Sequence, residues 1–473
     1  MFLDYKLLLT TAQRKDKSKI ERRRKSVMSQ YAGLPTGSMV PTSRFAESVS
    51  SMMPNTSKMY KIESSIEKMY NRDYLPINSN LFNGHIQDNF VEFSIPSSDQ
   101  ELIDLSSVAI ELKVRIVKAD NTAVTNASNI TLVDGFHHRI FQSHSVYLNG
   151  VQCESNSHFG LYNNIKVMTH MNKNNLGSLG RNMFYKSLDT DIIENITANY
   201  FTQENDSENK IINITRSGRI HTYGPLLLDI SDFDQYLLSG IETRIRLDLS
   251  PASILFMTNE NEQYSYVIEM CKMHVKVIRP YPSAMLSLNK QLFDKTKTME
   301  YIFSRPLMKQ VIFPANQSSL VIENPFNNVI PGTMYIFILS QKNLNGSYKT
   351  NSMYLEHANM SSIKVEIDGS VHSALSTSFP NAVASLFYNT LSVIGNDNLL
   401  NYENFRSGRT LLCYNLKNSD RSDTLDIERT GSMRISINTS NPLTSNHVLF
   451  VVGLTNAVIE IDGNRNVSKR YLM

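Results

Sequence analysis

Residues 110 to 116 read Ile110-Glu-Leu-Lys-Val-Arg-Ile116, so apolar and charged side chains alternate without a fault. Successive side chains of a β-strand point to opposite faces, which puts one face of such a segment on a core and the other toward water or a partner. The same alternation recurs in four later segments: Arg244–Leu249, Met273–Val277, Ile363–Asp368 and Met433–Ile437. Helical periodicity is rare, and the strand–helix alternation of a nucleotide-binding sheet is missing. The sequence therefore predicts an all-β chain.

Turn dipeptides punctuate the alternating segments. Asn-Gly and Asp-Gly favour the positive φ angles of tight connections and predict hairpins when strands flank them. The dipeptides that fit this pattern are Asn83-Gly84, Asp134-Gly135, Asn149-Gly150, Asn345-Gly346, Asp368-Gly369 and Asp462-Gly463.

The pattern occurs twice along the chain. A strand ending at Asn149-Gly150 is followed by helical spacing near 156–170, and a strand ending at Asp368-Gly369 is followed by helical spacing near 380–392. Further strands are expected at 266–278 in the first half and at 333–340 and 447–461 in the second. The prediction is two tandem jelly-roll β-sandwiches, a double jelly roll, with short interrupting helices and long surface loops.

These halves give the expected domain organisation. Residues 1–60 are expected to be a flexible basic N-terminal arm, 61–285 the first jelly roll and 286–473 the second. The Asn-rich, weakly periodic stretch 172–222 is expected to be a long loop of the first roll, because loops of this size are usually functional or disordered. The strand-poor stretch near 281–298 is expected to be the linker.

Composition excludes several classes of protein. The chain has 473 residues, of which 41% are hydrophobic and 19% charged, so it is too apolar to be disordered and too long for one ordinary domain. Three widely spaced cysteines, Cys153, Cys271 and Cys413, do not make a disulfide scaffold. No apolar run approaches the roughly 20 residues that span a bilayer. The N-terminus does not resemble a signal peptide, so synthesis inside the cell without glycosylation is expected.

Residues 14–25 concentrate the positive charge. This stretch holds eight basic and two acidic side chains, so it carries +6 while the whole chain carries +3. Such a cluster can neutralise phosphates or an acidic surface, although a solvated leader upstream of a later start at Met28 is the plainer alternative. The candidate residues for contact with nucleic acid or the inner capsid are Arg14, Lys15, Lys17, Lys19, Arg22, Arg23, Arg24 and Lys25.

Motifs for catalysis or cofactor binding are missing: the sequence has no phosphate-binding Gly-rich loop, no nucleophile elbow and no His-Glu-x-x-His. His137, His138 and His144 lack a further ligand for a metal and are interpreted as surface or interface histidines. The acidic group Asp229, Asp232 and Asp234 is interpreted as a polar loop that enters a short helix. No cofactor, no metal site and no enzymatic activity are expected.

Four ordered segments resemble a known family, the double jelly-roll major capsid proteins of Maverick/Polinton elements and adintoviruses. The first is Asn89-Phe-Val-Glu-Phe-Ser-Ile-Pro96 with Ile103-Asp-Leu-Ser106, and the second is Phe136–Gly150. The third is Tyr236-Leu-Leu-Ser-Gly-Ile-Glu-Thr-Arg-Ile-Arg246. The fourth runs from Leu344–Lys349 through Val365–Gly369 and closes with Val458–Val467. The resemblance covers about residues 60 to 473 and does not extend to the basic arm.

The resemblance implies a viral major capsid protein. Such proteins form homotrimers whose six jelly rolls make a pseudo-hexagonal, hexon-like capsomer, and the capsomers tile an icosahedral shell around a DNA genome. The expected partners are further copies of the chain, penton and minor capsid proteins, and the genome through the arm. The expected location is the virion, assembled inside the host cell in the nucleus.

Two other classes of function remain open from the residues alone. A glycan amidase built on two jelly rolls would need a pair of carboxylates with shifted pKa values in a cleft, and the sequence offers acids without a placed pair. A carbohydrate-binding or attachment β-sandwich protein is the other alternative, and a surface loop could add such binding to a capsid protein.

Overall fold

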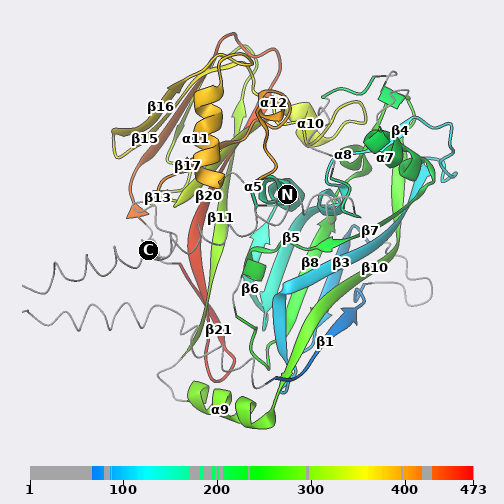
Figure 1. Ribbon diagram of the computed structural model, residues 1–473, viewed down its shortest axis with the longest axis vertical. Helices are drawn as coiled ribbons and strands as arrows, with labels where there is room; N and C mark the ends of the chain where they lie inside the picture. Colours follow the sequence, from blue (N-terminus) through cyan, green and yellow to red (C-terminus); the bar gives the residue numbers. More distant parts are fainter. Residues whose placement is uncertain are drawn as a thin grey trace, which may run out of the picture. The chain divides into compact units, whose positions relative to one another are not determined.

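Antiparallel strands are the main secondary structure of the residues that the structure describes (Figure 1). The computed structural model describes residues 66–78, 86, 88–170, 182–185, 194–197, 200–201, 206–232, 235–293, 298–395, 398–417 and 429–471. The segment from Lys61 to Met473 forms one compact unit. In the described part of the chain, no helix has both the length and the apolar content needed to cross a bilayer.

Two four-stranded sheets form the first jelly roll. One sheet has the order β1–β10–β3–β7 and the other the order β2–β8–β5–β6. The bounds of the first sheet are β1 (Ile66–Tyr74), β10 (Tyr264–Pro280), β3 (Leu102–Lys118) and β7 (Arg219–Pro225). Those of the second are β2 (Phe90–Ile95), β8 (Thr243–Leu249), β5 (Phe141–Leu148) and β6 (Val151–Asn156).

The second jelly roll repeats this topology strand for strand. Its sheets have the orders β11–β20–β14–β17 and β12–β19–β15–β16, and β21 (Val467–Tyr471) adds to β20. The first of these sheets contains β11 (Met299–Phe313), β20 (His447–Ile461), β14 (Thr333–Ser340) and β17 (Leu412–Asn415). The other contains β12 (Ser319–Glu323), β19 (Met433–Thr439), β15 (Met360–Ile367) and β16 (Ser370–Ser376). The predicted double jelly roll is thus confirmed.

Alternation sorts the side chains of each strand as expected. In β3, Leu112 and Val114 are buried in the first core, whereas the adjacent residues Lys113 and Arg115 point outward. Both sheets of each roll contribute to its core, so each roll is a sandwich.

Two of the predicted turns join equivalent hairpins. Asn149 and Gly150 have φ angles of 46° and 79° and connect β5 to β6, while Asp368 and Gly369 have φ angles of 50° and 75° and connect β15 to β16. Asp462-Gly463 lies in the connection from β20 to β21. Asp134-Gly135 and Asn345-Gly346 instead border short helices, and Asn83-Gly84 lies outside the described residues.

Helices follow both hairpins, as predicted. They are α5 (Phe159–His170) in the first roll and α11 (Ala384–Ile394) in the second. The other described helices are α4 (Phe136–Arg139), α7 (Asp206–Arg216), η3 (Asp229–Asp232), α8 (Ala252–Leu255), α9 (Pro282–Phe293), α10 (Gln341–Asn345) and α12 (Tyr402–Arg406). Two small ribbons pair β4 (Ile130–Leu132) with β9 (Phe256–Thr258) and β13 (Val329–Ile330) with β18 (Arg429–Thr430).

One expectation about the connections needs correction. The stretch 172–222 is not a loop throughout, because it contains α7 and the start of β7, which pairs with β3. The strand-poor stretch near 281–298, expected to be the linker, contains α9, which buries Met285 and Leu292. Met285, Leu288 and Leu292 recur at helical spacing, which was the sequence signal for this helix.

Candidate assembly surface

Helix α5 of the first jelly roll is buried on nearly every side. Its described side chains are buried except Lys166, which is partly exposed, and His170. Leu161, Ile165 and Met168 belong to an apolar cluster that includes residues of the second roll. The helix therefore lies between the two rolls and joins them through apolar contact (Figure 1).

The surface that α5 covers is the outer face of the sheet β11–β20–β14–β17. In β14, Met334, Ile336 and Ile338 fill the core of the second roll, while the alternate residues Tyr335, Phe337 and Leu339 join the α5 cluster. Phe337 stacks on Phe450 of β20 with ring centroids 5.1 Å apart. The unbroken apolar run from 334 to 339 was the sequence signal that this sheet is covered on both faces, and our sequence analysis missed it.

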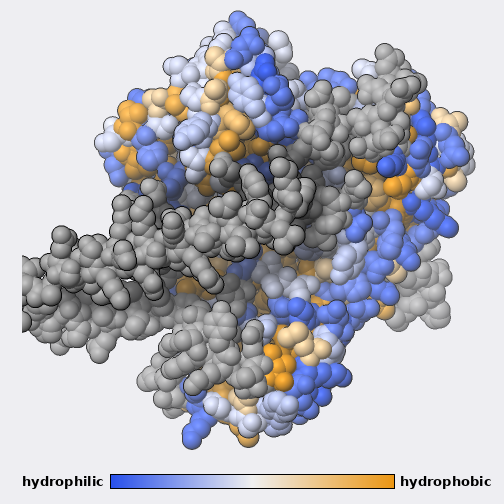
Figure 2. Space-filling view, viewed as in Figure 1, coloured by the Kyte–Doolittle hydropathy of each residue, from blue (hydrophilic) through white to orange (hydrophobic). Residues whose placement is uncertain are grey.

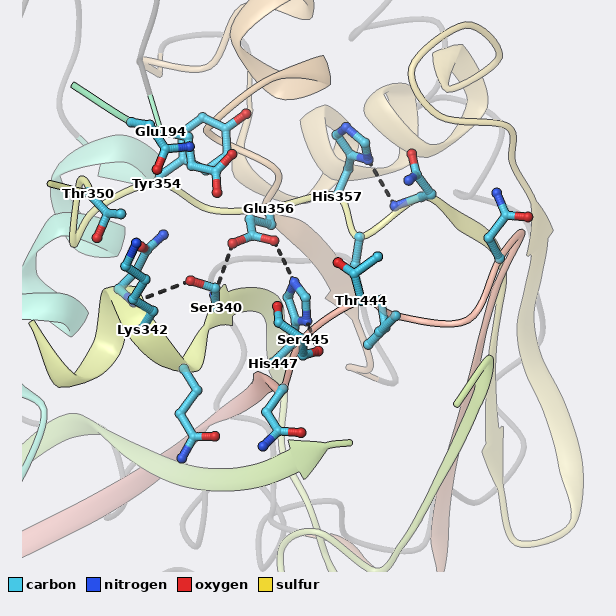
Figure 3. A pocket seen from close by; sticks show the side chains of 18 of the residues that line it. Glu194, Ser340, Lys342, Thr350, Tyr354, Glu356, His357, Thr444, Ser445 and His447 are labelled. Carbon is cyan, nitrogen blue, oxygen red and sulfur yellow. Dashed lines mark hydrogen bonds and ion pairs between the residues drawn. The ribbon is translucent and has the colours of Figure 1, made fainter. Parts of the chain in front are cut away.

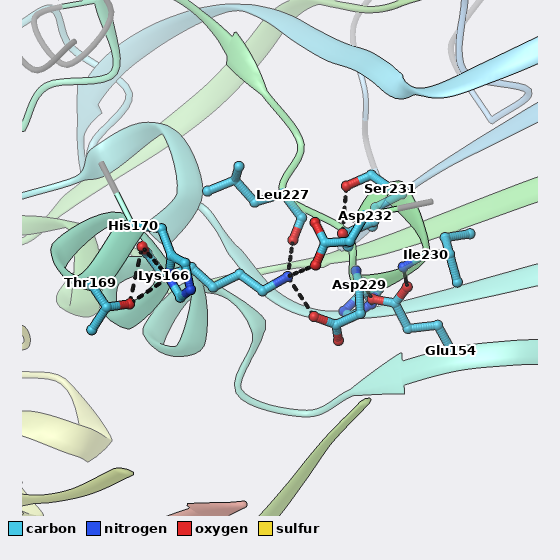
Figure 4. A network of polar contacts seen from close by, with 11 residues as sticks. Glu154, Lys166, Thr169, His170, Leu227, Asp229, Ile230, Ser231 and Asp232 are labelled. Atoms are coloured by element: carbon cyan, nitrogen blue, oxygen red, sulfur yellow. Dashed lines mark hydrogen bonds and ion pairs between the residues drawn. The ribbon is translucent and has the colours of Figure 1, made fainter. Parts of the chain in front are cut away.

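A buried polar network fixes α5 to its own roll (Figure 4). Lys166 Nζ lies 2.5 Å from Asp229 Oδ1 and donates to the Leu227 carbonyl at 3.2 Å. The Glu154 carboxylate accepts from the backbone N–H groups of Asp229 and Ile230 at 2.9 and 2.8 Å. Burial opposes the charge on Lys166, but the carboxylates of Asp229, Asp232 and Glu154 together outweigh it and raise the pKa of Lys166. The charged helix face is thus held by matched buried partners.

Polar contacts also tie the loops of the two rolls together. Arg409 Nη2 lies 3.1 Å from Asp134 Oδ2, and both side chains are buried. Tyr348 donates its hydroxyl to the Tyr264 carbonyl at 2.6 Å, and Lys349 Nζ donates to the Asn259 carbonyl at 2.7 Å. The interface between the rolls therefore combines an apolar centre with hydrogen bonds at its edge, as stable protein interfaces do.

Helix α11, the counterpart of α5, is covered on one side only. It buries Leu386 and Thr390 against its own roll, whereas Tyr388 is 75% exposed. The helix contains no charged residue, unlike an ordinary solvated helix face. Figure 2 shows hydrophobic residues at the surface over α11 and the neighbouring β15–β16 region, in the upper part of the view. An uncharged exposed helix of this kind is suited to contact with a partner.

The counterpart of the covered sheet face is the outer face of β1–β10–β3–β7, and it is polar. Glu111 on this face accepts from His221 at 2.8 Å and from His274 at 3.2 Å. Burial opposes ionisation of Glu111, but these two hydrogen bonds outweigh it and lower the pKa of its carboxyl. Tyr223 of β7 is exposed beside them. The two rolls thus carry equivalent faces of opposite character, one apolar and covered, the other charged and open.

The predicted site residues have different outcomes. The basic residues between Arg14 and Lys25 lie outside the described residues. The interpretation of the three histidines as surface or interface residues was wrong: His137, His138 and His144 are buried within the chain. His138 bonds the Tyr185 hydroxyl at 2.9 Å and the Pro225 carbonyl at 2.8 Å, and burial lowers its pKa to about 4. His144 pairs with Glu154 at 2.5 Å.

The remaining candidates hold structural positions. Asp229 and Asp232 lie in η3, where Asp229 pairs with Lys166, and Asp234 lies outside the described residues.

Burial raises the pKa of the Cys153 thiol to about 11 and those of Cys271 and Cys413 further, so none is a thiolate nucleophile at neutral pH. No cluster of potential metal ligands occurs among the residues the structure describes.

Comparisons with known proteins identify the fold. No family model and no curated protein matches the sequence. A chain from the cryo-EM structure of the Sputnik virophage has a TM-score of 0.58 and 11% identity, and the match covers 94% of this chain and 92% of that chain. A chain of the PBCV-1 virus capsid has a TM-score of 0.51 and 11% identity, covering 85% of this chain and 97% of that one. The chain has the fold of viral double jelly-roll major capsid proteins.

Proposed function

We propose that this chain is a viral major capsid protein that assembles as a pseudo-hexagonal homotrimer, and that such trimers tile an icosahedral shell around a DNA genome. The observation that carries the proposal is that two equivalent helices are buried to different extents. Helix α5 covers the outer sheet face of the second roll, while α11 and the outer sheet face of the first roll have no counterpart within the described residues.

A second copy of the chain would complete the pattern. If α11 of one copy lies on the outer face of β1–β10–β3–β7 of the next, every roll contacts its neighbour in the same way. Such a head-to-tail contact produces a ring when its rotation closes. Three chains contribute six rolls, and linking two rolls in one chain makes half of the contacts intramolecular.

The two contacts, one within the chain and one between chains, differ in polarity in a way that fits this arrangement. The contact within the chain is apolar and forms during folding, whereas the contact between chains would join an uncharged helix to a polar sheet face. More polar interfaces are typical of subunits that exist free before they assemble. A capsid subunit must stay soluble before assembly, so this asymmetry supports the proposal.

The proposal also covers the partners of the chain in the virion and the type of capsid protein it represents. The expected partners are penton and minor capsid proteins and, through the basic arm between Arg14 and Lys25, the genome. The role is structural, without catalysis, and the protein resides in virions assembled in the host nucleus. The ordered segments between Asn89 and Val467 support the Maverick/Polinton and adintovirus type in particular.

Mass photometry and negative-stain imaging of the purified full chain test the proposal. We expect particles with three times the 53.8-kDa chain mass and six lobes in projection. A chain that remains monomeric at the highest soluble concentration, in buffers from low to moderate salt, would contradict it.

A further inference from the structure

A polar cavity of about 750 Å³ opens beside the loops of the second jelly roll (Figure 3). Its walls come from α10, from the connection between α10 and β15, and from the connection between β19 and β20. Glu194 and Asn195 of the first roll close one side, where Asn195 bridges to Thr350. A cavity of this size falls within the range of small-ligand sites.

We propose that this cavity binds a neutral saccharide. The proposal goes beyond a role in the shell and does not depend on assembly. Most small-molecule sites are lined by apolar side chains with a few polar groups. More than half of the lining of this cavity is polar, and it includes the side chains of Ser340, Glu356 and Asn446. A sugar hydroxyl both donates and accepts, so it matches a wall that mixes donors and acceptors.

The charges on the cavity wall nearly balance. The acidic side chains Glu194 and Glu356 face the basic side chains Lys342 and His447. His447 Nε2 lies 2.7 Å from Glu356 Oε2, so part of this charge is already paired. Binding of phosphate or another anion usually requires a surplus of arginine, lysine or backbone N–H groups. The balanced wall favours an uncharged ligand.

The Glu356 carboxylate is held in place and can accept further hydrogen bonds. Its Oε1 accepts from the Ser340 backbone N–H at 3.1 Å and its Oε2 pairs with His447. A carboxylate can accept about four hydrogen bonds. The fixed carboxylate can therefore accept from sugar hydroxyls without moving, and Figure 3 shows it between Ser340 and His447 at the centre of the site.

Binding of the full-length protein to defined sugars tests the proposal. The probes are lactose, mannobiose and N,N′-diacetylchitobiose, with inorganic phosphate as the anionic comparison, followed by ligand-observed NMR and titration calorimetry. We expect saturable binding of at least one sugar and none of phosphate. Binding of phosphate alone, or of no sugar at millimolar concentration, would overturn the proposal.

One variant locates the binding. E356Q should weaken sugar binding by about tenfold or more, since it removes the charge and one acceptor from the carboxylate at the centre of the cavity. The matched control is E403Q, because Glu403 is 71% exposed and does not line the cavity. Equal affinities of E356Q, E403Q and the parent protein would overturn the assignment to this cavity.

Discussion

Arg409 of the second jelly roll and Asp134 of the first form an ion pair of 3.1 Å, with only 5% and 3% of their side chains exposed. The two residues are 275 positions apart in the sequence. Arg409 follows α12, and Asp134 precedes α4. The pair therefore lies within the interface between the rolls, where water is excluded and the attraction offsets part of the cost of burying both charges.

Removal of one partner should destabilise the chain strongly. Arg409→Met or Asp134→Asn alone is expected to lower the free energy of unfolding by about 3–5 kcal/mol, because the remaining group stays buried without its partner. The double variant should lose clearly less than the sum of the two. Urea unfolding of the three variants and the parent measures the coupling free energy, and additive losses would show that the pair does not hold the rolls together.

The strands and their duplication could be predicted from the sequence because their causes are local. Alternation in Ile110–Ile116 and the turn at Asn149-Gly150 depend on neighbouring residues only. The equivalent hairpins at Asn149 and Asp368, each followed by a helix, made the tandem arrangement visible. A period of two and a positive φ angle are properties of a few residues, so no long-range information was needed.

The burial of particular side chains could not be predicted, because their partners are distant in the sequence. His137 bonds Thr222, and His138 bonds Pro225, but both partners belong to β7, whose first residues we had assigned to a loop. Without that strand the histidines had no covering layer and were interpreted as surface or interface residues. The cavity beside α10 was missed for a similar reason, since its wall joins Glu194 to residues more than a hundred positions later.

Tyr388 of α11 gives the sharpest test of the contact between chains. Tyr388→Arg adds a charge to an uncharged exposed helix face, and Tyr side chains are often major contributors to interfaces. We expect trimer formation to weaken by at least about tenfold, which corresponds to about 1.4 kcal/mol. Sedimentation velocity across a concentration series measures this shift.

The partner face and a control complete that test. Tyr223→Arg on β7 should also weaken the trimer, because Tyr223 lies on the sheet face proposed to receive α11. Tyr281→Arg serves as the control, since Tyr281 is 49% exposed and lies on neither proposed surface. If Tyr281→Arg disrupts the trimer while the variants of Tyr388 and Tyr223 assemble normally, the subunits meet through other surfaces.

Glu101 should make the stability of the first roll sensitive to acid. Burial opposes ionisation of Glu101, but hydrogen bonds from Arg72, Tyr70 and Arg279 outweigh it and lower its pKa from 4.5 to about 2. A group whose pKa is lowered in the folded state contributes stability above its unfolded pKa, and this contribution disappears as the pH falls through the folded value.

The variant Glu101→Gln isolates this contribution. It should lower the free energy of unfolding by up to about 3 kcal/mol at pH 7, and the difference from the parent protein should shrink as the pH falls from 4.5 toward 2. Urea unfolding at a series of pH values measures it. Glu403→Gln, at a position that is 71% exposed, is the control and should change stability by less than about 0.5 kcal/mol. A pH-independent loss in Glu101→Gln would mean that side-chain shape rather than charge matters at this position.

The basic arm should control binding to nucleic acid. Replacement of the eight basic residues between Arg14 and Lys25 by glutamine removes the charge without shortening the chain. If each contacts a phosphate, the slope of log K against log salt should decrease in magnitude by up to about 7, because each contact contributes about 0.9. Fluorescence anisotropy with a double-stranded DNA fragment measures the slope, and Lys113→Gln on the outer sheet face controls for loss of charge from the body. Equal slopes for the parent and the arm variant, with normal trimers in both, would make the arm a passive leader and leave the genome to be held by other proteins.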